Sequence, residues 1–454
     1  MDSKLSFKSY AVVGMMLFAL FFGAGNLIFP AQLGQYAGTE VAIAIIGFLI
    51  TGVGLPLLGI LAIGYSRSED LQDLSSRVHP VYGVLFTSLL YLTIGPFFAL
   101  PRTGAVAYEV GIAPFVSESS VGAILLVFSI IFFAVALVIS LNPSKIVNSI
   151  GKFLSPAILV TLAVLLVAAF ITPMGQAGAP QGGYLDNAFM TGFLEGYNTM
   201  DALASLVFGI IVIAAIRKMG VKSPKGVLAA TLKSGLVAAA LLAIVYAGIA
   251  FLGATSTGTL GLLETGGPVL SGASAHYFGT FGALLIAVII TLACLTTAIG
   301  LIVANSEFFH KLTPKVSYKV YVVIFSVFSL IVANAGLSNI ITYSIPVLMF
   351  LYPLAIVLIL LAFTSPLFHH ARAVYVAAIT VTFFIAVIDG FKTLTGTLGV
   401  ANPAWLQTIV DVYGTILPLY NEGLGWLLPA VVAIVVTGLI VASRKGARVE
   451  AVRN

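Results

Sequence analysis

Residues 22–30 read Phe22-Gly23-Ala24-Gly25-Asn26-Leu27-Ile28-Phe29-Pro30 and lie inside an apolar stretch long enough to cross a membrane. Gly23 and Gly25 permit a helix to unwind, and Asn26 is a side chain that hydrocarbon alone does not accommodate. Unwound backbone at membrane depth occurs only where it faces protein or a watery cavity. We therefore expect a broken helix with a binding site at the break. A glycine-rich packing face between helices is the alternative.

The composition indicates a polytopic membrane protein. Of the 454 residues, 60% are hydrophobic and only 8% are charged, whereas soluble proteins carry ~25% charged residues. The single cysteine, Cys294, excludes an intrachain disulfide. The net charge of +5 comes from residues scattered over short loops, so we expect no nucleic-acid partner.

The apolar runs predict an all-α membrane protein of about twelve transmembrane helices, forming one transporter domain over residues 1–454. The predicted spans are 8–33, 40–64, 80–107, 121–140, 153–172, 189–216, 226–253, 277–306, 317–335, 338–363, 371–391 and 424–443. Nineteen of the 21 Lys and Arg residues then fall on one side, the exceptions being Lys392 and Arg102, which we place near the outer end of span three. Because cytoplasmic loops are enriched in basic residues, both termini are expected in the cytoplasm.

A second break is predicted in span six, which carries Glu195-Gly196-Tyr197-Asn198-Thr199-Met200-Asp201. Carboxylates inside a span are costly and are usually functional. Each half would contain an odd number of spans, so span six would run opposite to span one. Residues 8–172 and 189–363 would then form two halves of inverted topology, followed by two extra helices over 371–443. Matching breaks in inverted halves indicate a transporter site near the middle of the bilayer.

Several polar residues have more than one interpretation. Asp201 either pairs with a substrate ammonium group, carries a coupling proton, or caps the inner half of span six. Glu195 either gates the outer entrance together with Arg102, or both side chains reach the membrane interface by snorkelling. Thr296 and Thr297 in span eight are adjacent hydroxyls suited to sodium, although a threonine in a helix often bonds the carbonyl one turn back.

Together these stretches resemble known carriers. Gly23-Ala24-Gly25-Asn26, the broken span six, and Ala293 followed by Thr296 and Thr297 resemble the five-plus-five inverted-repeat fold of sodium-coupled amino-acid carriers. Within that group, residues 22–30, 196–201 and Gly95-Pro96-Phe97-Phe98-Ala99-Leu100-Pro101-Arg102 resemble the bacterial branched-chain amino acid:cation symporters. The resemblance covers essentially the whole chain.

The resemblance implies import of leucine, isoleucine and valine with sodium, or alternatively protons, across a bacterial inner membrane. It also implies roles for individual residues. Backbone groups of Gly23, Ala24 and Gly25 would hold the substrate carboxylate, and Tyr197 and Asn198 would line the pocket. Asn26 would serve either a second cation or the substrate. Asp201, which we also predict at the substrate site, departs from the broader sodium-coupled pattern and leaves open both the partner of the substrate amino group and the coupling ion. A sodium site would use the carbonyls of Ala19, Phe22 and Ala293 and the hydroxyls of Thr296 and Thr297.

Other classes of protein fit less well. An intramembrane hydrolase would need a base beside a nucleophile, and no histidine lies in a predicted span. A channel would need rings of polar residues along a pore. No phosphate-binding loop is present, so we expect a transporter, not an enzyme, driven by an ion gradient through alternating access, with no cofactor besides the coupling ion. Because no Lys or Arg is expected at the midplane, a neutral apolar amino acid is the predicted substrate; a proton-coupled carrier of other neutral amino acids is the alternative.

Overall fold

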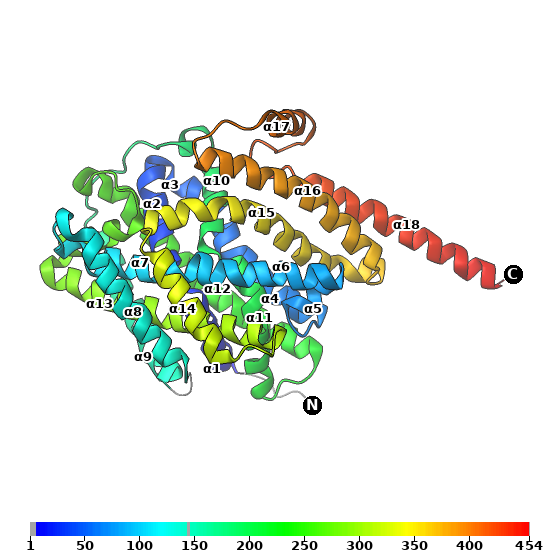
Figure 1. Cartoon of the computed structure of the whole chain (residues 1–454), viewed down its shortest axis with the longest axis horizontal. Helices are drawn as coiled ribbons and strands as arrows, with labels where there is room; N and C mark the ends of the chain where they lie inside the picture. The colour runs from blue at the N-terminus through cyan, green and yellow to red at the C-terminus, as the bar shows by residue number, and fades with distance from the viewer. Residues whose placement is uncertain (1–5, 143–145, 454) are drawn as a thin grey trace.

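The computed structural model describes residues 6–142 and 146–453, and every regular element in those residues is a helix (Figure 1). Lys4 and Lys145, two of the basic residues used to predict the orientation, lie outside the described residues. The helices up to the second break are α1 (Phe7–Phe21), α2 (Ala24–Ala37), α3 (Val41–Leu49), α4 (Leu55–Ser66), α5 (Leu71–Ser76), α6 (Pro80–Leu92), α7 (Ala99–Gly111), α8 (Val121–Ser140), α9 (Ile146–Ile171) and α10 (Gly183–Glu195). Those after it are α11 (Asp201–Lys218), α12 (Pro224–Leu260), α13 (Gly266–Leu312), α14 (Tyr318–Ala333), α15 (Leu337–Thr364), α16 (Arg372–Thr397), α17 (Ala404–Ile416) and α18 (Leu427–Arg453).

The predicted all-helical membrane fold is confirmed. Within the described residues, seven helical stretches are long and apolar enough to cross a membrane, or eight if α10 and α11, bent by 46°, count as one span. Two of the seven run through several labelled helices, Ala24–Ser66 through α2 to α4 and Pro80–Phe115 through α6 and α7. Shorter apolar helices, among them α1 and α14, add to these. Each of the twelve predicted spans coincides with a helix or with helices joined at a break, but the count of twelve crossings stays a prediction.

Both predicted breaks are present. Helix α1 ends at Phe21, and α2 begins at Ala24 after an extended Gly23. A short 3-10 turn, η6 (Gly196–Thr199), and a left-handed Met200 with φ of +63° separate α10 from α11. Left-handed backbone is rare for a residue with a side chain, so the span-six break is a definite change of direction.

A further break, which we did not predict, divides span three. A π-helical turn (η3, Thr93–Phe97) joins α6 to α7, and Gly95 within it has a non-helical ψ of −124°. Pro96 has no N–H to donate and disfavours helical backbone at the residue before it, so the sequence does explain the interruption.

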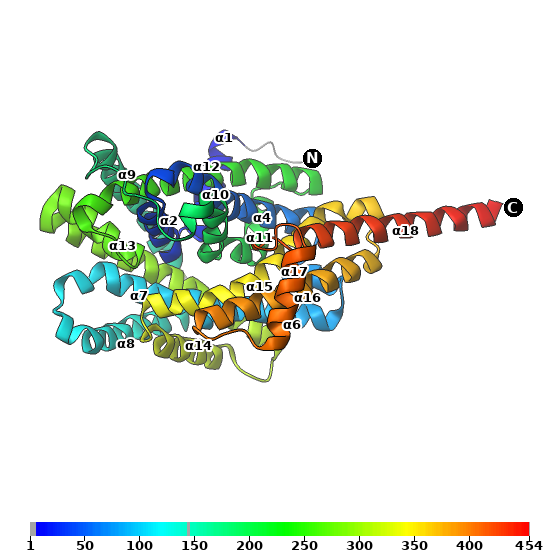
Figure 2. The same cartoon turned by 90° about the horizontal axis from the view of Figure 1, so that it is seen from above.

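Two elements extend beyond the predicted spans. Helix α13 starts at Gly266, well before the predicted span eight, and changes direction at Gly279, where φ is +63°. Helix α17 lies in a segment predicted to be an outer loop, and Figure 2 shows it crossing α16. Its alternation of apolar and polar residues has helical period, but it is too short to span a bilayer.

Two helix pairs contain the broken spans. Span one (α1 and α2) packs along α12, and span six (α10 and α11) packs along α3 and α4. In each pair, both helices contribute a glycine that allows close approach, because a Cβ at that glycine would collide with a carbonyl of the facing helix. The glycines and the residues whose carbonyls they face are Gly34 with Ala250, Gly253 with Ala31, Gly47 with Phe189, and Gly192 with Ala44. The two broken helices are therefore held in the same way.

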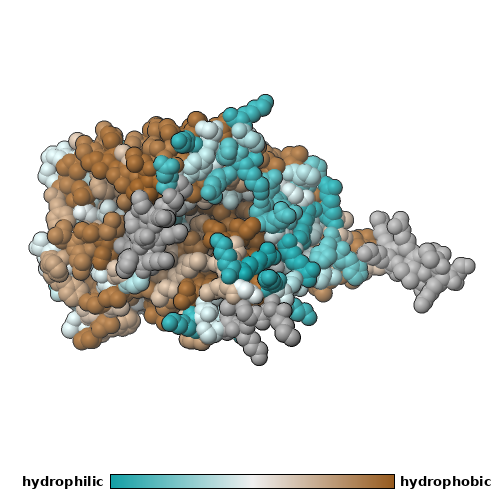
Figure 3. Space-filling view, turned by 90° about the horizontal axis from the view of Figure 1, so that it is seen from below, coloured by the Kyte–Doolittle hydropathy of each residue, from teal (hydrophilic) through white to brown (hydrophobic). Residues whose placement is uncertain are grey.

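The outer surface is suited to lipid. Many large apolar side chains are exposed, for example Phe281 at 75% and Leu439 at 66%. In Figure 3 apolar residues cover much of the face shown, while hydrophilic residues gather in the middle and toward the right of the view. Such a surface is stable only in a membrane.

Candidate functional site

The two breaks face each other across a cluster of three polar side chains. Asn26 Nδ2 of α2 donates to Asp201 Oδ2 of α11 at 2.5 Å and also to the hydroxyl of Tyr246 of α12. The Tyr246 hydroxyl donates to the same carboxylate oxygen at 3.2 Å. All three side chains are buried, at 2%, 4% and 0% exposure for Asn26, Asp201 and Tyr246 respectively. Spans one, six and seven therefore meet at one buried carboxylate.

The first break leaves backbone groups without helical partners. The Gly23 N–H donates to Asn26 Oδ1 at 2.9 Å instead of to the carbonyl of Ala19, which it would meet in a continuous helix. Phe22 lies between the two helices with an extended ψ of 90°. Ala24 and Gly25 occupy the first turn of α2, where N–H groups have no intrahelical acceptor. This break thus presents both carbonyls and N–H groups.

The second break is closed by local bonds of Thr199. Its hydroxyl donates to the Gly196 carbonyl at 2.9 Å and accepts from the Asp201 N–H at 3.2 Å. The Asp201 carboxylate instead bonds across to α2 and α12. Of the three roles considered for Asp201, capping of its own helix is therefore not the one that the geometry favours.

Arg102 occupies a place that we did not predict. Its guanidinium is 4% exposed and donates to the carbonyls of Asn198 at 2.6 Å and Thr199 at 3.3 Å, within the span-six break. It also lies 5.0 Å from the centre of the Phe29 ring. The prediction that Arg102 lies near the outer end of span three was wrong. The prediction that no Lys or Arg side chain lies near the middle of the bundle was also wrong. The break at Gly95, which starts a new helix at Ala99, puts Arg102 in the first buried turn of α7.

Glu195 does not pair with Arg102. Its Oε2 accepts from Asn198 Nδ2 at 2.8 Å, one turn along the same chain segment. Arg102 donates only to main-chain carbonyls in the contacts described, and it does not reach the membrane interface. The structure therefore shows neither of the two predicted arrangements of Arg102, a gate formed with Glu195 or a side chain that snorkels to the membrane interface.

The proposed sodium ligands of span eight lie beside the first break. The hydroxyls of Thr296 and Thr297 both donate to the Ala293 carbonyl, at 2.9 and 3.0 Å, which is the local bonding considered as the alternative. However, Thr297 Oγ1 lies 3.4 Å from where a Cβ on Gly23 would be. A hydroxyl that donates to a carbonyl keeps lone pairs for a cation. Cys294, next to Ala293, is completely buried.

Aromatic rings enclose the site. Tyr197 stacks on Tyr352 of α15 with ring centres 3.9 Å apart, and the Phe48 ring of α3 meets Tyr246 edge-on at 5.5 Å. Tyr246 and Tyr352 were not predicted as site residues. The one available signal was a tyrosine hydroxyl in the middle of an apolar span, where it needs a polar partner.

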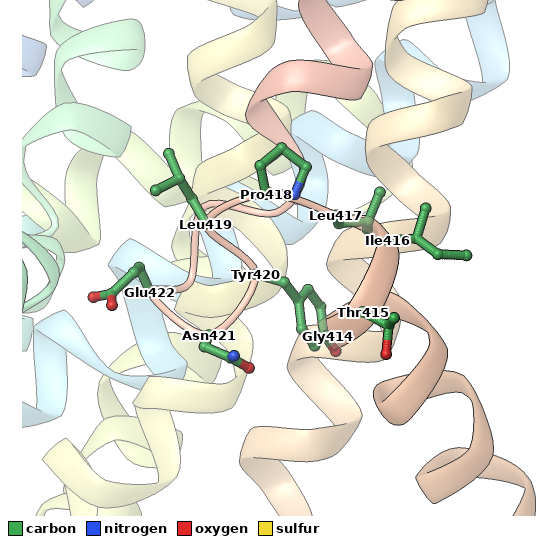
Figure 4. A pocket seen from close by; sticks show the side chains of 9 residues that line it. All are labelled: Gly414, Thr415, Ile416, Leu417, Pro418, Leu419, Tyr420, Asn421 and Glu422. Atoms are coloured by element: carbon green, nitrogen blue, oxygen red, sulfur yellow. The ribbon is translucent and has the colours of Figure 1, made fainter.

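A separate cavity of about 440 Å³ lies at the end of α17 and in the segment that joins α17 to α18. Figure 4 shows Tyr420 beside Gly414, whereas the Glu422 carboxylate points away. All its lining residues come from 414–422 and none from a broken helix. This cavity is therefore not the site predicted from the sequence.

A bundle of long apolar helices, in which two breaks join at a buried polar cluster, is the architecture of a membrane transporter. The fold matches that of a nucleobase-cation-symport-1 family transporter in a closed conformation with bromovinylhydantoin bound, with a TM-score of 0.59 and 16% identity over 96% of this chain and 93% of that one. Residues 6–444 match the family model described as branched-chain amino acid transport protein. The chain belongs to this family and is a transporter, not an enzyme.

Relatives named as branched-chain amino acid permeases or carriers align with nearly the whole chain. The chain is 48% identical to the branched-chain amino acid permease BrnQ of Bacillus subtilis, over 95% of its own length and 96% of the permease. It is 44% identical to the branched-chain amino acid transport system 2 carrier protein of Pseudomonas aeruginosa, over 93% of its length and 94% of the carrier. The membrane location follows from the family and from the long apolar helices.

Proposed function

We propose that this chain imports leucine, isoleucine and valine together with sodium by alternating access, at the site between the two breaks. The observation that carries this proposal is the bonding of Asn26, from the span-one break, to Asp201, from the span-six break. A ligand between these breaks would contact both halves of the protein at once, as a central transporter site requires.

Inverted halves over residues 8–172 and 189–363 are supported by how the helices pair. In two such halves, span one is equivalent to span six, and span two is equivalent to span seven. The packing of span one on span seven is then equivalent to the packing of span six on span two. Both pairs exist, and both use reciprocal glycine contacts. Spans one, two, six and seven would then move together against the remaining helices.

The first break suits an amino-acid substrate. The N–H groups of Ala24 and Gly25 at the start of α2 would bind a carboxylate, helped by the helix dipole and by the guanidinium of Arg102, because a Cβ on Gly25 would lie 2.7 Å from Arg102 Nη2. Asp201 would accept the substrate ammonium group. Tyr197, Asn198 and Asn26 would contribute the rest of the pocket, where aromatic and aliphatic neighbours favour an apolar side chain.

Sodium coupling is supported by the oxygen atoms beside the same break. The Ala19 carbonyl has lost the Gly23 N–H, and Phe22, Ala293, Thr296 and Thr297 would complete an all-oxygen site suited to a hard cation. Sodium shared with helix-one backbone would raise substrate affinity. The competing proposal is a proton carried by Asp201, with other neutral amino acids as substrates.

Proteoliposomes separate these two coupling ions. Thr297→Ala should raise the sodium concentration needed for half-maximal leucine uptake and leave the pH profile unchanged. Asp201→Asn tests the alternative, because a proton carrier without this carboxylate would exchange leucine but not accumulate it. Thr313→Ala, a threonine outside the site whose hydroxyl also bonds a carbonyl one turn back, is the matched control.

The decisive measurement is leucine accumulation by the parent protein with sodium replaced by choline. Full accumulation without sodium would contradict the sodium site. Competition of leucine uptake by isoleucine and valine, but not by glutamate, is expected for the proposed pocket.

A further inference from the structure

A second pocket, of about 780 Å³, opens on the face predicted to be cytoplasmic. The end of α4 and the start of α12 form one side, and the other side consists of Arg77 and the connection between α15 and α16. Four of its ten lining residues carry basic side chains, Arg67, Arg77, Lys225 and His370, and none is acidic. A concave site with one sign of charge concentrates the opposite sign.

Hydrogen bonds within the protein fix the position of one of these basic side chains, Arg77. Arg77 Nη2 donates to the Ser66 carbonyl at 2.6 Å and to Ser68 Oγ at 3.1 Å, which fixes the guanidinium at the pocket wall. Arg67 and Lys225 are exposed, and neither has a hydrogen-bond or ion-pair partner for its side chain among the residues described. Of the two acids that follow Arg67 in the chain, Asp70 pairs with Lys311 at 3.1 Å, and Glu69 forms no ion pair with any described residue. The positive charge of the pocket is therefore not neutralised within the described chain.

The backbone around the pocket also favours an anion. Arg67 and His370 are both left-handed, with φ of +56° and +58°, a conformation that residues other than glycine seldom adopt and that recurs at ligand sites. The 37-residue helix α12 begins at Pro224, in the pocket wall, with its positive dipole end.

An apolar track leads from the pocket toward the bilayer. Leu228 lines the pocket, and Leu232 and Leu236 follow at four-residue spacing on the same face of α12. Leu232 is 41% exposed and Leu236 is 53% exposed. A soluble anion would have no use for such a track, whereas an acyl chain would cover it.

We propose that this pocket binds the phosphate of an anionic glycerophospholipid from the cytoplasmic leaflet, with an acyl chain along Leu228, Leu232 and Leu236. Basic pockets between transmembrane helices on the cytoplasmic side are suited to such headgroups. If the proposed alternating access holds, the headgroup would join spans two and seven, which move, to the α15–α16 connection, which does not. The lipid would then stabilise one state of the transport cycle.

Binding of phosphatidylglycerol to the purified full-length protein tests the proposal without measuring transport. The double variant Arg67→Gln/Lys225→Gln should bind dioleoylphosphatidylglycerol about 30-fold more weakly than the parent, because each Lys or Arg near an anionic lipid contributes ~1 kcal/mol. Lys315→Gln/Lys319→Gln removes two exposed charges from the same side of the protein but outside the pocket, and should bind like the parent. Phosphatidylcholine should bind weakly to all three.

Equal binding by the two double variants would overturn the pocket as the site. Competition by inorganic phosphate or glycerol phosphate at the same concentration as the lipid would overturn the lipid as the source of the phosphate. Since the readout is lipid affinity, a failure here is distinct from a failure of the proposed sodium-coupled transport.

Discussion

At the scale of single residues, Arg102 binds the backbone of the span-six break. A break of this kind leaves carbonyls without helical donors inside a membrane, where each unsatisfied group costs several kcal/mol. The Arg102 guanidinium donates to two of these carbonyls, on Asn198 and Thr199. A planar fork can do this and a single ammonium group cannot do it equally well, so we regard Arg102 as a positioning residue for the site.

Arg102→Lys should therefore raise the leucine concentration at half-maximal counterflow by about tenfold, since losing one bond to a charged donor costs ~1.5–3 kcal/mol. Arg102→Ala should abolish counterflow. Leucine counterflow in proteoliposomes, together with the melting temperature in detergent, checks this.

The matched control is Arg372→Lys, because the Arg372 guanidinium donates to the Val78 carbonyl at 2.9 Å away from the site. This control should leave the half-saturation concentration unchanged. If Arg102→Lys changed only the melting temperature and not the half-saturation concentration, a role in positioning the site would be excluded.

At the scale of helices, the two close pairs explain why glycine is used where it is. Gly192 of α10 lies so near the Ala44 carbonyl of α3 that any Cβ would collide with it. In lipid, helices associate through such close van der Waals packing and not through a hydrophobic driving force between them. The glycines therefore determine how closely each broken span lies against its partner.

Gly192→Ala should lower the stability by about 1–3 kcal/mol, the usual effect of adding a methyl group to a filled interface. Gly300→Ala, at a helical glycine with no atom within 4 Å of an added Cβ, should leave it unchanged or slightly higher. Melting temperatures of the two purified variants provide the comparison. Equal values would show that the α3–α10 contact does not depend on glycine.

The sequence predicted the breaks at Gly23 and Met200 because glycines or carboxylates interrupt apolar spans there. It did not predict the break at Gly95, although Gly-Pro is a strong breaker, because Pro is also common in continuous transmembrane helices. The error at Arg102 followed from this, since a span without a break carries that residue outward. Tyr246 was missed because its contact with Asp201 joins two spans that only folding brings together.

At the scale of the whole molecule, the charge distribution predicts how the bundle lies in the membrane. The basic residues that line the second pocket come from the connections between three pairs of predicted spans, and all three connections were assigned to the cytoplasmic side. Because these residues line one pocket, the three connections lie on the same side of the bundle, which agrees with the predicted cytoplasmic side. Lys392, one of the two exceptions, lies at the other end of α16 from Arg372.

Cysteine introduced for Lys319, which is exposed on the predicted inward face, should resist an impermeant thiol reagent added to intact cells. Cysteine introduced for Val400, 54% exposed after α16, should react readily. Labelling measured before and after permeabilising the cells gives the orientation. The reverse pattern would invert the proposed topology.

The complete burial of Cys294 has a practical consequence for following this protein at work. A single thiol enclosed within the bundle contributes no background reaction, so spectroscopic probes can be attached at introduced cysteines without first altering the native chain. Probe pairs at positions 225 and 319 would report the separation of span seven from span nine as a distribution of distances. The transport cycle can thus be followed in a protein that keeps its native residues around the ion and substrate sites.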